Sequence, residues 1–112
     1  IGADIMPEDQ KLVIETARLI RVGFLQQNAY HDIDTYVPLE KQLKMMQVIL
    51  RLYDGARALI ARSIPLSQLK ATGIFETLTK IKYEVANDQM EKFAEYDRLV
   101  DEALDSVDKA NR

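Results

Sequence analysis

Apolar residues recur at steps of three and four along most of the chain, which is the spacing of one helical face. The first run predicts a helix over 8–27, opened by Pro7 and by acids that suit the positive end of a helix dipole. The second predicts a helix over 39–62 that follows Pro38, and at ~1.5 Å per residue it would span roughly 35 Å. The side chains expected to face the core are Leu12, Val13, Ala17, Ile20 and Phe24 in the first helix, and Leu39, Leu43, Met46, Ile49, Leu50, Tyr53, Ala56 and Ile60 in the second.

The second half of the chain predicts shorter elements. Pro65 ends the second helix and starts a single turn over 65–69, and Thr72-Gly73 is a break. A short helix is expected over 74–83. Ile74, Leu78 and Ile81 are predicted to face the core. Lys80, Lys82 and Glu84 are predicted to face water.

The last periodic run predicts a helix over 88–109, with Asn87 as its N-cap. Its opposite face is dense in acids, which is typical of a solvated surface. These acids are Glu91, Glu95, Asp97, Asp101, Glu102, Asp105 and Asp108. No strand-like alternation competes with the helical spacing. The pattern therefore predicts an all-α fold, an antiparallel bundle of about four helices with a short extra turn.

Composition narrows the class of protein. The chain has 112 residues, enough for one domain, and 47% hydrophobic and 29% charged residues, the range of a globular protein. The absence of Cys excludes disulfides, Cys-ligated zinc and thiol nucleophiles. No apolar run approaches the ~20 residues that cross a bilayer, so direct membrane insertion is not expected. The net charge is −3, without a basic run interleaved with aromatics, so nucleic-acid binding is not expected either.

Motifs that would carry catalysis are missing from the sequence. It holds no G-x-x-x-x-G-K-[ST], no G-x-S-x-G and no H-E-x-x-H. His31, Asp32 and Asp34 could ligate a metal, but one His and two nearby acids in a loop are more typical of a capping network. We therefore predict no catalytic residue and no metal site in this chain.

The stretch over 24–40 differs from the rest of the sequence. It carries amides, acids, the only His and two Tyr, and indicates an ordered loop between two helices, where function tends to reside. Gly23, directly before it, marks either a kink or close contact, or else a tolerated surface glycine.

Residues 24–42 read FLQQNAYHDIDTYVPLEKQ, and this string closely resembles the catalytic A subunit of A-type and V-type rotary ATPases. In that family F-L-Q-Q-N-A-F-H-x-V-D-T-Y-C-P-x-E-K-Q lies in the C-terminal helical domain. LVIETARLIR over 12–21 extends the resemblance upstream. Together these two strings, the strong part of the resemblance, cover under half of the chain. Tyr30 stands where the family usually has Phe, and Val37 where it usually has Cys.

The resemblance implies that 1–112 is the C-terminal bundle domain of a larger catalytic subunit, whose nucleotide-binding P-loop domain lies upstream and is absent here. In the family this bundle closes over the adenine side of ATP or ADP, which the whole subunit binds with Mg²⁺ and hydrolyses or synthesises. No cofactor is expected on the isolated domain, which without a P-loop is predicted to be inactive. The residues implied to border the adenine are Phe24, Gln26, Gln27, Ala29 and Tyr30. For Phe24 and Tyr30, packing in the core of the bundle is an open alternative.

A weaker likeness reaches the beta subunit of F-type ATP synthase. The acidic start over 2–9 is similar to its D-E-L-S-E-E-D lever, which implies that Asp4, Glu8 and Asp9 meet the central stalk. The alternative is that these acids only favour a helix N-terminus.

The resemblance also implies central-stalk subunits and the non-catalytic B subunit as partners, translocation of protons or sodium ions, and a cytoplasmic location, peripheral to the membrane, in the ATPase head. The competing hypothesis is a free-standing helical interaction module without an ATPase role. A P-loop motif upstream in the same gene would favour the first hypothesis.

Overall fold

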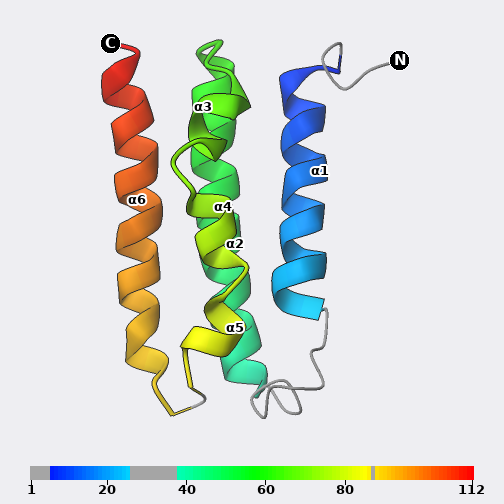
Figure 1. Cartoon of the computed structure of the whole chain (residues 1–112), viewed down its shortest axis with the longest axis vertical. Coiled ribbons are helices and arrows are strands. Elements are labelled where there is room, and N and C mark those ends of the chain that lie inside the picture. Colours follow the sequence, from blue (N-terminus) through cyan, green and yellow to red (C-terminus); the bar gives the residue numbers. More distant parts are fainter. Residues whose placement is uncertain (1–5, 26–37, 87) are drawn as a thin grey trace.

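Three long helices lie side by side in the protein, with the second one in the middle (Figure 1). The computed structural model describes residues 6–25, 38–86 and 88–112. The long helices are α1 (Glu8–Ile20), α2 (Leu39–Ala61) and α6 (Phe93–Ala110). Every regular element within the described residues is helical, which confirms the all-α prediction. The molecule measures 41 × 32 × 19 Å, so it is flattened in the direction perpendicular to the row of long helices.

The chain reverses direction between successive long segments. It runs along α1, returns along α2, and comes back through three short helices before the last helix, α6 (Figure 1). The short helices are α3 (Leu66–Lys70), α4 (Ile74–Leu78) and α5 (Ile81–Glu84). Consequently α2 and α6, which make the most extensive contact in the bundle, point the same way.

The core is centred on α2 because this helix contacts α1 on one side and α6 on the other. Its buried apolar residues belong to one core cluster together with buried apolar residues of α1, α3, α4, α5 and α6. Burying this surface is the main favourable term for folding, at ~25 cal/mol per Å². The most deeply buried of these apolar side chains are Leu12, Leu19, Val48, Leu52, Ala56, Leu69, Ile81, Val85 and Val100.

The predicted inward faces of α1 and α2 are partly wrong. In α1 the buried residues are Leu12 and Leu19, whereas Val13 is 54% exposed. In α2 the predicted Leu39, Leu43 and Leu50 are 70%, 55% and 50% exposed. The buried α2 residues are instead Lys41, Met45, Val48, Ile49, Leu52, Ala56 and Leu59. Both helices carry more apolar residues than one face can bury, so spacing alone left more than one choice of face.

The first helix changes its winding before the loop. The sequence predicts regular helix over 8–27, but α1 ends at Ile20 and continues as one wider π-helical turn, η2 (Arg21–Leu25). Such turns are rare in proteins, and those that occur are often found at functional sites. The last two predicted positions, Gln26 and Gln27, lie outside the described residues.

The helix predicted over 74–83 is broken in two. Its interruption is at Thr79, whose hydroxyl donates to the carbonyl oxygen of Glu76 at 2.6 Å, a bond that competes with the helical ladder. Because α5 restarts at Ile81 after this break, the predicted exposure of Lys82 is wrong, and its side chain is only 3% exposed. The inward prediction for Ile74, Leu78 and Ile81 is confirmed.

The last helix begins later than predicted. Its first turn is a 3₁₀ turn, η4 (Met90–Lys92), which leads into α6 at Phe93. The predicted N-cap, Asn87, lies outside the described residues. The N-cap position of α6 is Lys92, whose side chain makes no capping hydrogen bond. The end of the helix at Ala110 is one residue beyond the prediction.

The C-terminus of α2 closes in a Schellman motif. The N–H of Ile64 donates to the carbonyl of Leu59 at 3.1 Å, and the N–H of Ser63 to the carbonyl of Ile60 at 2.9 Å. This geometry places Ser63 in the left-handed region, with φ +64°, where a side chain is unfavourable. The motif turns Pro65 and α3 back over the bundle.

Replacing Ser63 with glycine is expected to raise the free energy of unfolding by about 0.5–1 kcal/mol, since glycine adopts φ > 0 without the Cβ clash. Urea unfolding of the 112-residue chain measures this. Gly73→Ala is the matched reverse control: Gly73 has φ +81° and open space around it, so its substitution should lower stability through backbone strain alone. Equal stability of Ser63→Gly and the parent chain would contradict the strain argument.

Candidate functional site

The predicted adenine-bordering residues occupy the segment between α1 and α2. Phe24 lies in η2, one residue after Gly23. Gln26, Gln27, Ala29 and Tyr30 lie outside the described residues, and so do His31, Asp32 and Asp34. The site can therefore be built from its two flanks, η2 before the segment and the first turn of α2 after it.

The flank before the segment packs against backbone. Gly23 is buried, and a Cβ at this position would lie 2.8 Å from the Cα of Thr79 and 3.3 Å from its carbonyl oxygen. Real Cβ atoms do not approach backbone this closely, so only glycine fits without a shift of η2 or of the turn after α4. Of the alternatives for Gly23, the structure selects the close contact.

The flank after the segment holds a buried lysine. Lys41 in the first turn of α2 is 0% exposed, and its ammonium donates to the carbonyl oxygens of Lys82, at 3.0 Å, and Val85, at 2.5 Å. These carbonyls stand at the C-terminal end of α5, the negative end of its dipole, where a cation is favourable. Burial lowers the pKa of Lys41, and the charge of Lys82 lowers it further.

Helix α5 contacts η2 and accepts the bonds of Lys41, and it is also tied to α6. The hydroxyl of Tyr96 donates to a carboxylate oxygen of Glu84 at 2.8 Å. Burial raises the pKa of Tyr96, and the bond to Glu84 raises it further, so the hydroxyl keeps its proton near neutral pH. Ile81 and Val85 bury their side chains in the core. The short helix is thus fixed by apolar and polar contacts together.

The acidic start of α1 serves a contact within the bundle. A carboxylate oxygen of Glu8 accepts from the N–H of Leu66, the first residue of α3, at 2.8 Å, and Lys11 donates to the other oxygen at 3.0 Å. The first of these bonds is the larger cause of the lowered pKa of Glu8. Asp9 accepts from the N–H of Gln10 at 2.9 Å and is exposed, and Asp4 lies outside the described residues. Glu8 is thus held by α3 and by Lys11 within the bundle.

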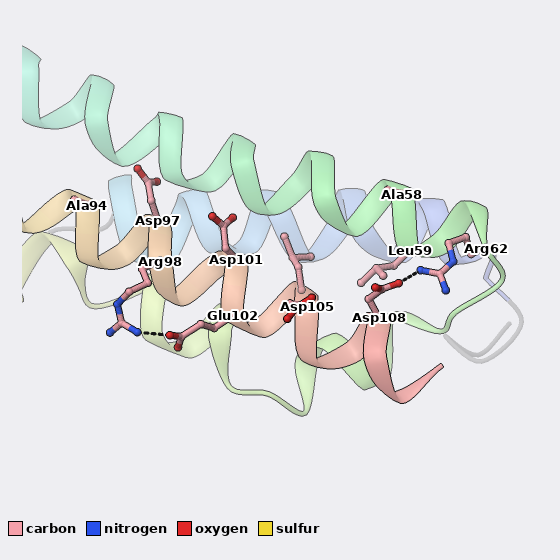
Figure 2. A pocket seen from close by; sticks show the side chains of 11 residues that line it. Ala58, Leu59, Arg62, Ala94, Asp97, Arg98, Asp101, Glu102, Asp105 and Asp108 are labelled. Carbon is pink, nitrogen blue, oxygen red and sulfur yellow. Dashed lines mark hydrogen bonds and ion pairs between the residues drawn. The ribbon is translucent and has the colours of Figure 1, made fainter. Parts of the chain in front are cut away.

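A shallow groove of about 830 Å³ runs between α2 and α6, and acids of α6 line it (Figure 2). Basic residues pair with most of its acids. Arg51 makes a two-pronged contact with Asp101, at 2.9 and 2.7 Å, and Arg62 pairs with Asp108. Arg98 bonds to two glutamates of its own helix, one of them Glu102 (Figure 2). Exposed pairs of this kind are worth ~0–1 kcal/mol each. The groove is thus a largely neutralised surface, and no predicted site residue lines it.

Two residues in the contacts of the flanks, Lys41 and Thr79, have no role in the sequence-based prediction. Lys41 belongs to the recognised string, but a lysine at a helix start gives no sign that it will be buried. Thr79 lies far from Gly23 in the sequence, and their contact follows only from the fold. The sequence gives one weak sign of these contacts, Gly23, which directly precedes the unusual segment over 24–40.

No helix in the described part of the chain is long and apolar enough to cross a membrane. Among the same residues, no three His, Cys, Asp or Glu side chains gather in a group that could hold a metal ion.

Comparison with known proteins gives one consistent family. A family model described as the C-terminal domain of V and A type ATP synthase matches residues 1–70. The V-type ATP synthase alpha chain 2 of Clostridium tetani is 49% identical over 90 residues, covering 80% of this chain and 15% of that protein. The V-type ATP synthase alpha chain of Halothermothrix orenii is 39% identical over 102 residues, covering 91% and 17%.

An archaeal relative shows the same pattern. The A subunit of the A-type ATP synthase of Sulfolobus acidocaldarius is 37% identical over 109 residues, covering 96% of this chain and 18% of that protein. The chain therefore spans less than a fifth of the length of these relatives. The resemblance carried by residues 24–42 is confirmed, and the chain belongs to the family of C-terminal domains of V-type and A-type ATP synthase alpha chains, or A subunits.

Proposed function

We propose that residues 1–112 form the C-terminal bundle domain of the catalytic subunit of a rotary ATPase. In this role the domain borders the adenine of ATP or ADP and passes the conformational change of the nucleotide site to the central stalk. The observation that carries the proposal is the family match over 1–70, which contains the whole of the 24–42 string. ATP synthesis or hydrolysis, Mg²⁺ binding and ion translocation belong to the complete assembly.

The flanks of the segment suit a wall beside a base better than a phosphate site. The ammonium of Lys41, the buried cation nearest to it in sequence, is directed to two backbone carbonyls. Gly23 provides close backbone packing directly before the recognised string. Phe24, Gln26, Gln27, Ala29 and Tyr30 are the side chains assigned to the adenine. When bound, the nucleotide and Mg²⁺ supply the phosphoryl chemistry, which this chain only borders.

The partners in this role are the central stalk and the non-catalytic B subunit, in the cytoplasmic head of the ATPase. Asp4 and Asp9 are the candidate stalk contacts. Glu8 belongs to this proposal less directly, because its carboxylate already accepts from Leu66 and Lys11. Its side chain orients the start of α1, from which the stalk contact would be made.

Replacement of Tyr30 in the complete subunit tests the adenine role. Base–aromatic stacking is worth ~1–3 kcal/mol, so Tyr30→Ala is expected to weaken ATP and ADP binding roughly ten- to a hundredfold. Tyr30→Phe keeps the ring face and should be nearly silent. Nucleotide titration and thermal melting are measured on the same variants.

The two measurements separate binding from packing. If Tyr30 packs in the bundle, Tyr30→Ala lowers the melting temperature and leaves nucleotide affinity almost unchanged. That result would remove Tyr30 from the adenine site.

A further inference from the structure

Helix α2 carries a second apolar stripe, which the bundle does not bury. Three of the five large apolar residues that are exposed in the described chain lie on this helix: Leu39, Leu43 and Leu50. Together with the partly buried Met46 and Tyr53 they form a row with steps of four, three, four and three residues, which we call the α2 seam. This is the a/d spacing of a coiled coil, and it fits the side of a second helix. An exposed apolar row of this kind marks an interaction surface.

The α2 seam is complementary to itself when two copies of the helix lie antiparallel. In such a pair each a position faces a d position of the other helix. When the twofold axis passes beside Val48, Met46 of one copy faces Leu50 of the other, and Leu43 faces Tyr53. The axis repeats both pairs, so the two seams form one continuous apolar contact.

The next residue of the row, Arg57, fits the end of this arrangement. Its guanidinium carbon lies 5.9 Å from the centre of the Tyr53 ring, so its side chain lies along the seam. In the antiparallel register it faces Leu39 of the other copy, over which the aliphatic part of an arginine packs well. In a parallel pair Arg57 would face the same arginine, and the two like charges would repel.

The other charges that border the seam favour the antiparallel arrangement as well. Glu40 and Lys44 are exposed at its first end, and Asp54 and Arg57 are exposed at its last. None of these four makes an ion pair with another residue of the described chain. Antiparallel pairing places Glu40 beside Arg57 of the other copy, and Lys44 beside Asp54. Charges beside a helical seam set the orientation of the partner helix in this way.

We propose that the α2 seam is the surface through which two copies of this chain associate, with their α2 helices antiparallel. The seam offers five apolar positions, whereas a standard interface involves about 20–30 residues a side. The dimer is therefore weak and dissociates on dilution. The inference rests on the exposed face of α2 and is independent of the proposed function.

Sedimentation equilibrium of the 112-residue chain over a range of concentrations tests the association. The apparent mass should rise from 12.8 kDa toward twice that value. Leu43→Gln removes an apolar contact on each side of the twofold axis, so it should raise the dissociation constant at least about tenfold. Ile14→Gln is the matched control, because Ile14 is 52% exposed on α1 and lies off the seam. Circular dichroism melts of both variants verify that the monomers are folded.

A charge exchange tests the antiparallel register. Glu40→Arg and Arg57→Glu, made separately, each place like charges at both ends of the dimer and should weaken it roughly three- to tenfold. A mixture of the two variants should dimerise like the parent chain, since every end of the mixed dimer then pairs opposite charges. Glu91→Arg reverses an exposed acid outside α2 and should have no effect.

Three results would contradict the proposal. A monomeric mass at every concentration would overturn it and leave the seam to a different protein or to another part of a longer subunit. A dimer that Leu43→Gln does not weaken would place the contact on another surface. A dimer that Leu43→Gln weakens, but that does not recover in the mixture of charge variants, would overturn the antiparallel register.

Discussion

Leu52→Ala is expected to lower the free energy of unfolding of the 112-residue chain by about 3 kcal/mol, within the ~2–5 kcal/mol range of buried leucines. Leu52 is 1% exposed in the middle of α2, the helix that contacts both α1 and α6. Truncation removes its apolar contacts and leaves a cavity that a helix packed on both sides cannot close. Urea unfolding should show a lower midpoint with an unchanged slope.

Leu50→Ala is the matched control, since it is the same substitution two residues earlier on the same helix. Leu50 is 50% exposed, so its loss should cost less than about 1 kcal/mol, partly offset by the higher helix propensity of alanine. The sequence pattern placed Leu50 in the core and passed over Leu52, so the pair discriminates between the two choices of face. A larger loss for Leu50→Ala than for Leu52→Ala would show that α2 is rotated from its position here.

The existence and order of the helices were predictable because proline, glycine and apolar spacing mark them locally. Pro38 and Pro65 each stand directly before the first residue of a helix, and α2 ends one residue before its predicted end. Which face is buried was less predictable. Both α1 and α2 carry apolar residues on more than one face, and the selection depends on neighbours that are remote in the sequence. Gly23 packs against the chain at the break at Thr79, in a contact between residues that are far apart in the sequence.

The string of residues over 24–42 located the candidate site, but the contacts that its flanks make could not be predicted. The string over 24–42 is specific enough to identify the family, because its unusual composition is a local property of the sequence. The contacts of its flanks, from Gly23 to Thr79 and from Lys41 to the carbonyls of Lys82 and Val85, are long-range and leave little local trace. Lys82 shows the same limit, since a break three residues earlier turned a predicted surface lysine inward.

The largest effect we expect is the loss of folding when the chain is cut back to the family match. Residues 1–70 contain α1, α2 and α3 but lack α6, the most extensive partner of α2. Ten of the 21 buried apolar residues in the described chain lie beyond residue 70. Without them, the apolar side chains that α2 buries against α6 return to water at ~1.5–3 kcal/mol each, and a domain is usually stable by only ~5–15 kcal/mol.

The fragment 1–70 should therefore melt without a cooperative transition by circular dichroism, whereas 1–112 melts cooperatively. Mixing the fragment with a peptide of residues 71–112 should recover part of the helical signal, because α6 would return its apolar stripe to α2. A cooperative melt of 1–70 alone would contradict this and place the folding unit within the family match. The expected result means that α4, α5 and α6 are required for the fold that carries the recognised segment, even though they lie outside the matched stretch.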